Sequence, residues 1–354
     1  MMWQIIDKEN TEAVAQMEQF VTGHGKGHFM QHPRWSNVKQ FWDWRGIMIY
    51  QHNRIAAAMS VLIRPMPLGL SLLYAPRGPV CDRNDPVVWA ELMAALKRMA
   101  KEHRALLLYL DPDEPDMNSE FRSLMKELKF REQTDDGFGN IQPQFVFRLA
   151  LDDRDEEGIY GAFTQKTRYN IRLARRKGVT IQEYSGSEFI PETVLDRFAA
   201  LMETTGQRDR FQVRGKDYFK MLLNTLGNDA RLFMACYQDV PIAGSIEVFC
   251  GKKAWYLYGA SANDHRNVMP NYLLQWTMIR RAMERGCTMY DFRGVPGEVA
   301  EDHPLYGLYR FKKGFSGSYT KFTGLFVYSF LPMSSFLIEM AIKLRKWIRS
   351  IRKA

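Results

Sequence analysis

The sequence predicts a mixed α/β protein built from two similar units. Of its 354 residues, 46% are hydrophobic and 25% are charged, which is typical of a globular chain long enough for two domains. Short apolar runs alternate with amphipathic helical patterns along most of the chain. The order of these elements occurs twice, and such a repeat is stronger evidence than any single motif.

Each copy of the repeat begins with a β-hairpin, in which two apolar strands flank a polar turn. The hairpin sequences correspond: YQHNRIAA at 50–57 resembles YQDVPIAG at 237–244. A further strand, an amphipathic helix and a final apolar strand follow in each half, which indicates two mixed sheets with helices on their faces. The three elements are expected at 71–74, 87–102 and 105–110 in the first copy and at 254–258, 271–285 and 288–292 in the second.

This order of elements resembles that of the acetyltransferase-like (GNAT) fold. We therefore expect two tandem GNAT-like domains, at 1–150 and 151–320, with the C-terminal segment 321–354 joining the first. Most GNAT proteins hold the pyrophosphate of an acyl-CoA on the backbone amides of an Arg/Gln-x-x-Gly-x-Gly/Ala turn. The nearest run, 175–180, ends in threonine and follows a helix C-terminus, where an anion is disfavoured. An acyl-CoA donor is therefore a weaker hypothesis.

The segment 289–315 has the features of a functional site. We expect a buried strand at 288–292 that is interrupted at 293–297 by glycine and proline. An acidic turn and an aromatic-rich segment follow, and they lead to Lys312, Lys313 and Gly314. The alternative is a surface turn beside a half-buried helix.

A formal net charge of +9 favours a polyanionic partner, such as a nucleic acid, a phosphorylated substrate or an anionic membrane. A basic helix is expected at 160–177, with Gly178 as its C-cap. Its cations either follow the phosphates of a nucleic acid or form a solvated face. The cations are Lys166, Arg168, Arg172, Arg175, Arg176 and Lys177.

The C-terminal segment 333–354 predicts a basic amphipathic helix with Trp347 on its apolar face. Such a helix suits the surface of an anionic membrane, and the alternative is a helix docked on the first domain. The run 325–342 contains a proline, serines and a glutamate, so it is a poor transmembrane span. No signal peptide is visible at the start of the sequence, so we expect a cytoplasmic protein, peripheral at the inner membrane face.

Five motifs together resemble the FemABX aminoacyltransferases. They follow one order along the chain: FMQHPRWSNVK at 29–39, YAPRGPV at 74–80, LDP at 110–112, KTRYNI at 166–171 and FKKG at 311–314. The resemblance implies transfer of an amino acid from aminoacyl-tRNA to an amine on the stem peptide of a peptidoglycan precursor. The acceptor is lipid II or UDP-MurNAc-pentapeptide. Too few residues separate Glu203 from Tyr218 for a coiled-coil arm, so the chain looks like the compact FemX-type members.

The resemblance also implies roles for individual residues. Lys312 would stabilise the transition state, and Asp111 is a carboxylate near the substrate. Lys39 and Arg214 would hold the diphosphate of the precursor, for which two cations are suited. The remaining residues are Tyr218 and Tyr258, which would line the substrate, and Lys313, which would contact tRNA together with the basic helix.

The chemistry needs no cofactor besides aminoacyl-tRNA, because the donor ester is already activated. The proton of the attacking amine could go to Asp111, to the vicinal ribose hydroxyl or to bound phosphates. Alternatively, Asp111 is a structural carboxylate at the turn of Pro112. The four cysteines are far apart and read as buried thiols, and no cluster of residues has metal-ligand spacing, so we expect no metal.

Two other functions remain open at this stage. One is an acyl-CoA-type N-acyltransferase on the same fold, and the other is a non-catalytic protein that binds tRNA or a membrane; DNA is not expected as a partner. The sequence leaves the donor amino acid open among glycine, alanine and serine. It also leaves open the acceptor amine, which could belong to lysine, diaminopimelate or a bridge residue.

Overall fold

The computed structural model describes residues 2–133, 141–209 and 211–331. The chain divides into two compact units, of which the first comprises 1–135 and 322–354 and the second 136–321. The expected C-terminal helix at 333–354 lies outside the described residues. No helix in the described part is both long and apolar enough to cross a membrane.

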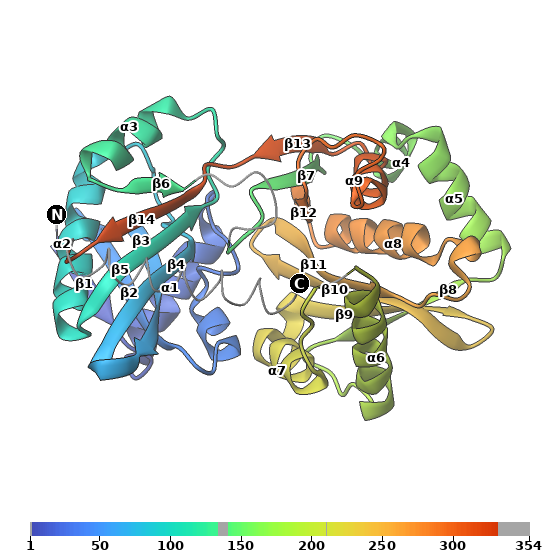
Figure 1. The fold of residues 1–354 in the computed structure, drawn as a ribbon, viewed down its shortest axis with the longest axis horizontal. Helices are drawn as coiled ribbons and strands as arrows, with labels where there is room; N and C mark the ends of the chain where they lie inside the picture. Colours follow the sequence, from blue (N-terminus) through green and yellow to red (C-terminus); the bar gives the residue numbers. More distant parts are fainter. Residues whose placement is uncertain (1, 134–140, 210, 332–354) are drawn as a thin grey trace. The chain divides into compact units, whose positions relative to one another are not determined.

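The first unit is built on a seven-stranded sheet in the order β1-β2-β3-β4-β5-β14-β6 (Figure 1). Helices α2 and α3 cover one face, where they bury Trp89, Leu92 and Phe121 in the main core of the unit. Helix α1 packs on the other face, since Met17 lies against Gly46 of β2. The elements are β1 (Met2–Ile6), α1 (Thr11–Gly23), β2 (Asp43–Gln51), β3 (Arg54–Met66), β4 (Leu70–Arg77), α2 (Pro86–Glu102), β5 (Ala105–Pro112), α3 (Ser119–Glu127), β6 (Arg131–Gln133) and β14 (Leu325–Ser329).

The second unit repeats this plan, with the strand order β13-β7-β12-β11-β10-β9-β8. Figure 1 shows α6 and α7 on one face of the sheet and α8 on the other. The elements are β7 (Phe145–Ala150), α4 (Glu156–Ala162), α5 (Gln165–Arg176), β8 (Thr180–Ser185), α6 (Glu192–Asp209), α7 (Lys216–Leu226), β9 (Ala230–Tyr237), β10 (Val240–Cys250), β11 (Lys253–Ser261), α8 (Pro270–Glu284), β12 (Met289–Val295), α9 (Tyr306–Lys313) and β13 (Ser318–Lys321). The expected mixed α/β class, with two sheets in two similar units, is confirmed.

The predicted internal repeat extends to the geometry of the turns. Both hairpins close through two residues with positive φ, which are His52 and Asn53 in the first unit and Gln238 and Asp239 in the second. A turn with positive φ at both central residues matches the right-handed twist of the flanking strands. In each unit the strand after the hairpin then pairs in parallel with the strand after the helix, as β4 with β5 and β11 with β12.

One strand in each sheet pairs with strands that are distant from it in sequence. β7 precedes all the other strands of the second sheet and pairs with β12 and β13. β14 follows the whole second unit and inserts between β5 and β6 of the first sheet. The expected domain boundary after residue 150 therefore differs from the observed division at 135, because β7 hydrogen-bonds in the second sheet.

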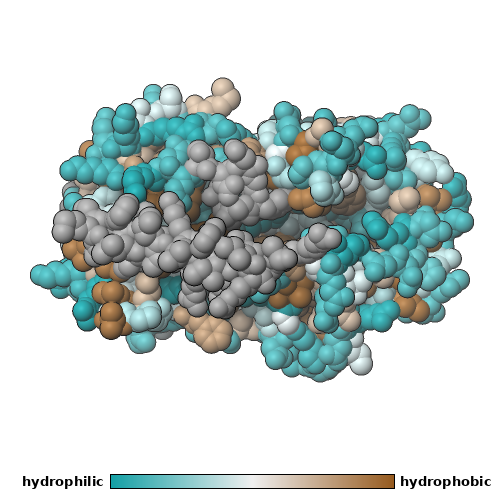
Figure 2. Space-filling model, in the orientation of Figure 1, coloured by the Kyte–Doolittle hydropathy of each residue, from teal (hydrophilic) through white to brown (hydrophobic). Residues whose placement is uncertain are grey.

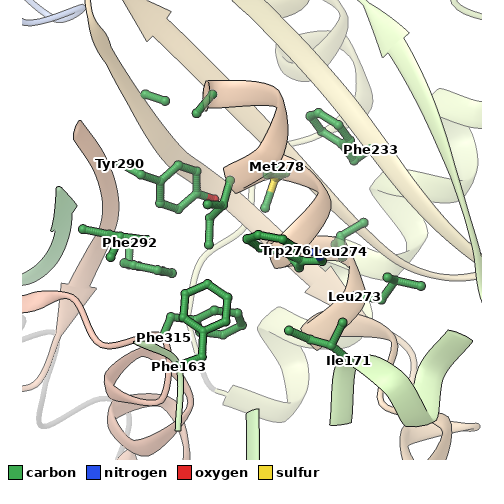
Figure 3. Packing of buried hydrophobic residues seen from close by; sticks show 14 of the residues in the cluster. Phe163, Ile171, Phe233, Leu273, Leu274, Trp276, Met278, Tyr290, Phe292 and Phe315 are labelled. Atoms are coloured by element: carbon green, nitrogen blue, oxygen red, sulfur yellow. The ribbon is translucent and has the colours of Figure 1, made fainter. Parts of the chain in front are cut away.

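The core of the second unit joins three helices that surround the candidate site. Figure 3 shows Phe163 and Phe315 beside Trp276 of α8. The rings of Phe163 and Phe315 are 5.1 Å apart between centroids, and those of Phe163 and Trp276 are 5.4 Å apart. These edge contacts fix the C-terminal end of α9 against α8 and the start of α5.

The described surface is mainly hydrophilic on the face shown in Figure 2, where apolar residues occur in small groups. Large exposed apolar side chains are dispersed along the chain, as with Phe41, Leu68, Met117 and Phe189. Dispersed exposed apolar residues are ordinary in globular proteins and do not themselves mark a site.

Candidate functional site

Strand β12 contributes Arg293 and Gly294 to the candidate site. It continues to Val295, so the expected interruption at 293 was placed too early. A bulge between Asp291 and Gly294 replaces the interruption, and Arg293 has a positive φ of 60° within it. Oδ1 of Asp291 accepts a hydrogen bond from the Arg293 backbone nitrogen at 2.6 Å, which stabilises this turn of the strand.

Helix α9 places Lys312 above this bulge. The side chain of Lys312 is buried, with 4% of the residue exposed. Its Nζ donates a hydrogen bond to the carbonyl oxygen of Gly294 at 2.8 Å and lies 5.5 Å from the ring centroid of Tyr256. The alternative of a surface turn beside a half-buried helix therefore does not hold for Lys312.

Burial lowers the pKa of Lys312 from 10.5 to about 7; the Asp291 carboxylate opposes this change, and Arg293 adds to it. The cause is desolvation, which disfavours the charged form of a buried amine. At neutral pH, protonated and neutral forms of Lys312 are therefore both populated. A negative charge that develops beside Nζ would favour the protonated form.

Lys312 lines a cavity of about 1300 Å³ that lies within the second unit. Strand β11 supplies Tyr256 and Tyr258 to the wall, and α5 supplies Lys166 and Asn170. Cationic side chains outnumber acidic ones in the lining, which includes Lys166, Arg208, Arg266, Arg293, Arg310 and Lys312 against Asp209 and Asp264. Such a cavity favours an anionic ligand with an aromatic or apolar portion.

Three of the expected substrate residues lie close together in the second unit. The hydroxyls of Tyr218 on α7 and Tyr258 on β11 are 3.1 Å apart and hydrogen-bonded. The Arg214 guanidinium lies 5.2 Å from the ring centroid of Tyr218. Burial raises the pKa of both phenols, so each remains a neutral hydrogen-bonding group.

Asp111 and Lys39 belong to the first unit. The carboxylate of Asp111 accepts hydrogen bonds from the Tyr74 hydroxyl at 2.7 Å and from the Arg77 backbone nitrogen at 2.9 Å. These hydrogen bonds fix the orientation of the Asp111 carboxylate, and both of its expected roles, as a base and as a structural carboxylate at the turn of Pro112, stay predictions. Lys39 caps a short 3-10 helix (Pro33–Val38), and its Nζ lies 4.6 Å from the Trp35 ring centroid. The expected convergence of Lys39 with Arg214 also stays a prediction.

The basic helix begins later than the sequence indicated. Helix α5 starts at Gln165, because Phe163 is extended and the Thr164 side chain accepts from the Thr167 nitrogen as an N-cap. Gly178 follows the C-terminus with a positive φ of 86°, as predicted.

The cations of α5 differ in their surroundings. Arg168 Nη1 donates to the carbonyl oxygens of Gly161 and Phe163 at the end of α4, so this side chain connects the two helices. Lys166, Arg172, Arg175 and Arg176 are exposed. The Nζ of Lys313 lies 5.4 Å from the ring centroid of Tyr309. Arg172, Arg175 and Arg176 share one face of α5, whereas Lys166 lines the cavity. Contact of these cations and Lys313 with tRNA stays a prediction.

Within the residues described, no group of three or more His, Cys, Asp or Glu side chains is arranged to hold a metal ion. The four cysteines are buried free thiols, as the sequence indicated.

Comparison with known proteins supplies the family. The sequence model of the FemAB family matches residues 13–238 and 236–343, which is nearly the whole chain. The chain belongs to the FemAB family. Its expected resemblance to the FemABX aminoacyltransferases is thereby confirmed.

Relatives of this FemAB protein are named as transferases, so the expectation of a transferase is confirmed. A lipid II:glycine glycyltransferase of Staphylococcus epidermidis is 28% identical over 371 aligned positions, which cover 84% of this chain and 87% of the relative. The protein of the same name from Staphylococcus aureus is 27% identical, with 83% and 86% covered.

Solved structures agree on the fold of the FemAB protein. The crystal structure of FemX superposes with a TM-score of 0.84 at 24% identity and covers 95% of this chain and 99% of that one. A tandem GNAT protein from the clavulanic acid biosynthesis pathway gives a TM-score of 0.55 at 10% identity, with 93% and 98% covered.

The sequence did not identify every residue that lines the cavity. Asn170 lies within the KTRYNI motif, but no role was assigned to it. The signal was present, because Asn170 follows Lys166 by four residues and so shares its face of the helix. Tyr256 and Arg293 were missed because their positions depend on the register of β11 and on the bulge of β12.

Proposed function

We propose that this protein is an aminoacyltransferase that moves an amino acid from aminoacyl-tRNA to an amine on the stem peptide of a peptidoglycan precursor. The observation that carries the proposal is Lys312, which is buried in a basic cavity of about 1300 Å³ in a chain of the FemAB family. Glycine is the proposed donor among glycine, alanine and serine, since the staphylococcal relatives are named lipid II:glycine glycyltransferases.

In the proposed reaction, the amine nitrogen attacks the carbonyl carbon of the aminoacyl ester. A C–N bond forms, the ester C–O bond breaks, and the terminal ribose of the tRNA leaves as a hydroxyl after receiving a proton. Negative charge grows on the carbonyl oxygen during the attack. The protonated Nζ of Lys312, which is buried at the wall of the cavity, stabilises this charge.

The amine must also lose a proton, and Asp111 is the protein group proposed to receive it. Tyr74 and Arg77 hold its carboxylate in one orientation. If the ribose hydroxyl or the phosphates take the proton instead, Asp111→Asn will retain most of its single-turnover rate, whereas a base predicts a loss of about 10²-fold or more.

The remaining expected residues are proposed to bind the two substrates. Lys39 and Arg214 bind the diphosphate of the precursor, and Tyr218 and Tyr258 line its peptide. The exposed cations of α5, together with Lys313, contact the phosphates of tRNA. We propose lipid II as the acceptor rather than UDP-MurNAc-pentapeptide. A lipid-linked acceptor would place the protein at the inner face of an anionic membrane.

The test is transfer of labelled amino acids from a mixed pool of charged tRNA. Purified protein is offered lipid II and UDP-MurNAc-pentapeptide in separate reactions, and the products are identified by mass. We expect glycine to be added to lipid II, with Lys312→Ala slower by about 10²- to 10³-fold.

Transfer to neither acceptor, by protein that still binds tRNA, would contradict the proposal. The matched lysine control is Lys97→Ala on α2 of the first unit, since Lys97 is exposed and is not among the proposed site residues. This variant should transfer glycine at the rate of the unaltered protein.

A further inference from the structure

Asn170 is a buried side chain whose hydrogen-bonding capacity the protein does not use. Only 3% of the residue is exposed, and its Nδ2 finds no hydrogen-bond partner within the described part of the chain. A buried donor without a partner costs folding free energy, and native proteins contain few of them. Asn170 lines the same cavity as Lys312, so a bound ligand can supply the missing acceptor.

The surroundings of Asn170 indicate the chemistry of that ligand. Lys166 lies one helical turn earlier and also lines the cavity. Other parts of the wall contribute Arg266 and Arg310 as cations and Tyr272 and Phe311 as aromatic side chains. Cations suit phosphate, aromatic faces suit a nucleobase, and a free amide donor suits a ring nitrogen, a ribose oxygen or a phosphate oxygen. Together they favour a nucleotide.

The volume of the cavity supports the same conclusion. At about 1300 Å³ it exceeds the roughly 300–1000 Å³ that is usual for small-molecule pockets. An amino acid alone would leave most of this space empty, whereas an amino acid esterified to a terminal nucleotide would fill more of it.

The start of α5 also contacts the C-terminal end of α9, the helix that carries Lys312. The Thr164 backbone nitrogen donates to the carbonyl oxygen of Gly314 at 3.0 Å, directly after α9. A Cβ at Gly314 would overlap with Oγ1 of Thr167, so the two segments approach closely here. A ligand bound to Asn170 would therefore be held at a fixed position relative to Nζ of Lys312.

We propose that Asn170 is a positioning residue, which donates a hydrogen bond to the 3′-terminal nucleotide of the aminoacyl donor. This inference rests on the proposed function, because it takes the donor to be an aminoacyl ester of a nucleic acid. Lys166 supplies the neighbouring positive charge for the phosphate of that nucleotide. The interaction orients the ester toward Lys312 and takes no part in the transfer of protons.

The test measures binding of an uncharged RNA hairpin that ends in CCA, by fluorescence anisotropy, so that activity is not needed. Asn170→Ala should bind the hairpin about threefold to tenfold more weakly, which is the usual effect of losing one hydrogen bond. Its melting temperature without RNA should stay close to that of the unaltered protein, because the amide donor has no partner to lose. Asn224→Ala, which changes an exposed asparagine on α7, is the matched control and should bind as the unaltered protein does.

Kinetics with a charged hairpin provide the second readout. Asn170→Ala should raise KM for the hairpin and leave KM for the acceptor unchanged. If the alanine variant does not fold, Asn170→Asp retains the shape while replacing the donor with an acceptor, and it should weaken hairpin binding at least as much.

The outcomes separate the two proposals. If the unaltered protein does not bind the hairpin, both the proposed function and this inference are wrong. If it binds and transfers glycine, but both Asn170 variants bind the hairpin equally well, only the inference is overturned. A large loss of thermal stability in Asn170→Asp with unchanged hairpin binding would likewise assign Asn170 a structural role.

Discussion

Two buried ionisable side chains of the second unit depart from their ordinary pKa values in opposite directions. Lys312 has its pKa lowered to about 7, and Glu247 on β10 has its pKa raised well above 4.5. In both cases the first cause is burial, which favours the neutral form. Each shift makes stability depend on pH, and each pKa unit corresponds to about 1.4 kcal/mol.

For Lys312, the unfolded chain binds more protons than the folded chain between pH 7 and 10.5. The unfolding free energy contributed by this lysine therefore rises with pH across that window. We expect Lys312→Met to be more stable than the unaltered protein near pH 6 and the difference to shrink toward pH 10. Urea unfolding at several pH values measures the difference in unfolding free energy between the two proteins. A difference that is independent of pH would contradict the lowered pKa of Lys312.

For Glu247, the dependence of stability on pH has the opposite sign: stability falls as pH rises. The carboxyl is fully buried, and neither oxygen has a hydrogen-bond partner among the described residues. Glu183 also raises its pKa, and Arg285, Arg231 and Arg281 oppose that increase. Above pH 4.5 the unfolded chain loses this proton while the folded chain keeps it, so stability falls as pH rises.

Glu247→Gln should remove the loss of stability that Glu247 causes as pH rises, because the amide does not ionise. We expect the variant to gain unfolding free energy relative to the unaltered protein between pH 5 and 8, with almost no gain at pH 4. A stability difference between the variant and the unaltered protein that is independent of pH would contradict the raised pKa of Glu247.

At the residue scale, motif resemblance predicted Lys312 as a site residue, since FKKG stands in an aromatic segment. It could not predict Glu247 or Asn170. The environment of Glu247 depends on which strands flank β10, and that of Asn170 depends on a cavity formed by α5, β11 and α9. Neither the strand order nor the cavity is encoded in a local pattern.

At the scale of elements, the contact between α9 and α5 positions Lys312. Gly314 is required there because Oγ1 of Thr167 occupies the space of a Cβ. Gly314→Ala should destabilise the protein by about 1–3 kcal/mol, as overpacking of a close contact typically does. Thermal unfolding measures the loss.

The double variant Gly314→Ala with Thr167→Ala is the control for this contact. It removes the overlapping oxygen, so it should be more stable than the sum of the two single effects predicts. Strict additivity would show that the overlap is relieved elsewhere and that the contact does not fix α9.

Local sequence signals predicted most elements but erred at two ends near the site. The helix over 160–177 was expected to be continuous. The Thr164 cap begins a new helix instead. Strand β12 was expected to end at Phe292, yet the bulge at Arg293 lets it continue past a glycine. In both cases a hydrogen bond from a backbone nitrogen to a side-chain oxygen outweighed the average preference of the residues.

At the scale of the whole molecule, the placement of strands β7 and β14 decides which fragments can fold. Residues 136–321 contain all seven strands of the second sheet, so this fragment should unfold cooperatively by itself. Residues 1–135 lack β14, which fills the place between β5 and β6 and buries Phe326 in the core. We expect this fragment to be unstable alone.

A short linker that joins 1–135 directly to 322–331 should restore cooperative unfolding of the first unit, as followed by circular dichroism. Stable folding of 1–135 without that segment would contradict the role given to β14. The sequence repeat predicted two units, but the observed boundary at 135 could not be predicted, since which sheet receives a strand is a long-range property of the chain.

The central claim is that Lys312 promotes transfer of an amino acid to a stem-peptide amine. The most direct measurement is the single-turnover rate of glycine transfer from glycyl-tRNA to lipid II by the unaltered protein and by Lys312→Met. We predict that glycine is added to lipid II and that the variant is slower by about 10²-fold or more while it binds both substrates normally. Equal rates for the two proteins, or no transfer by the unaltered protein, would contradict the account.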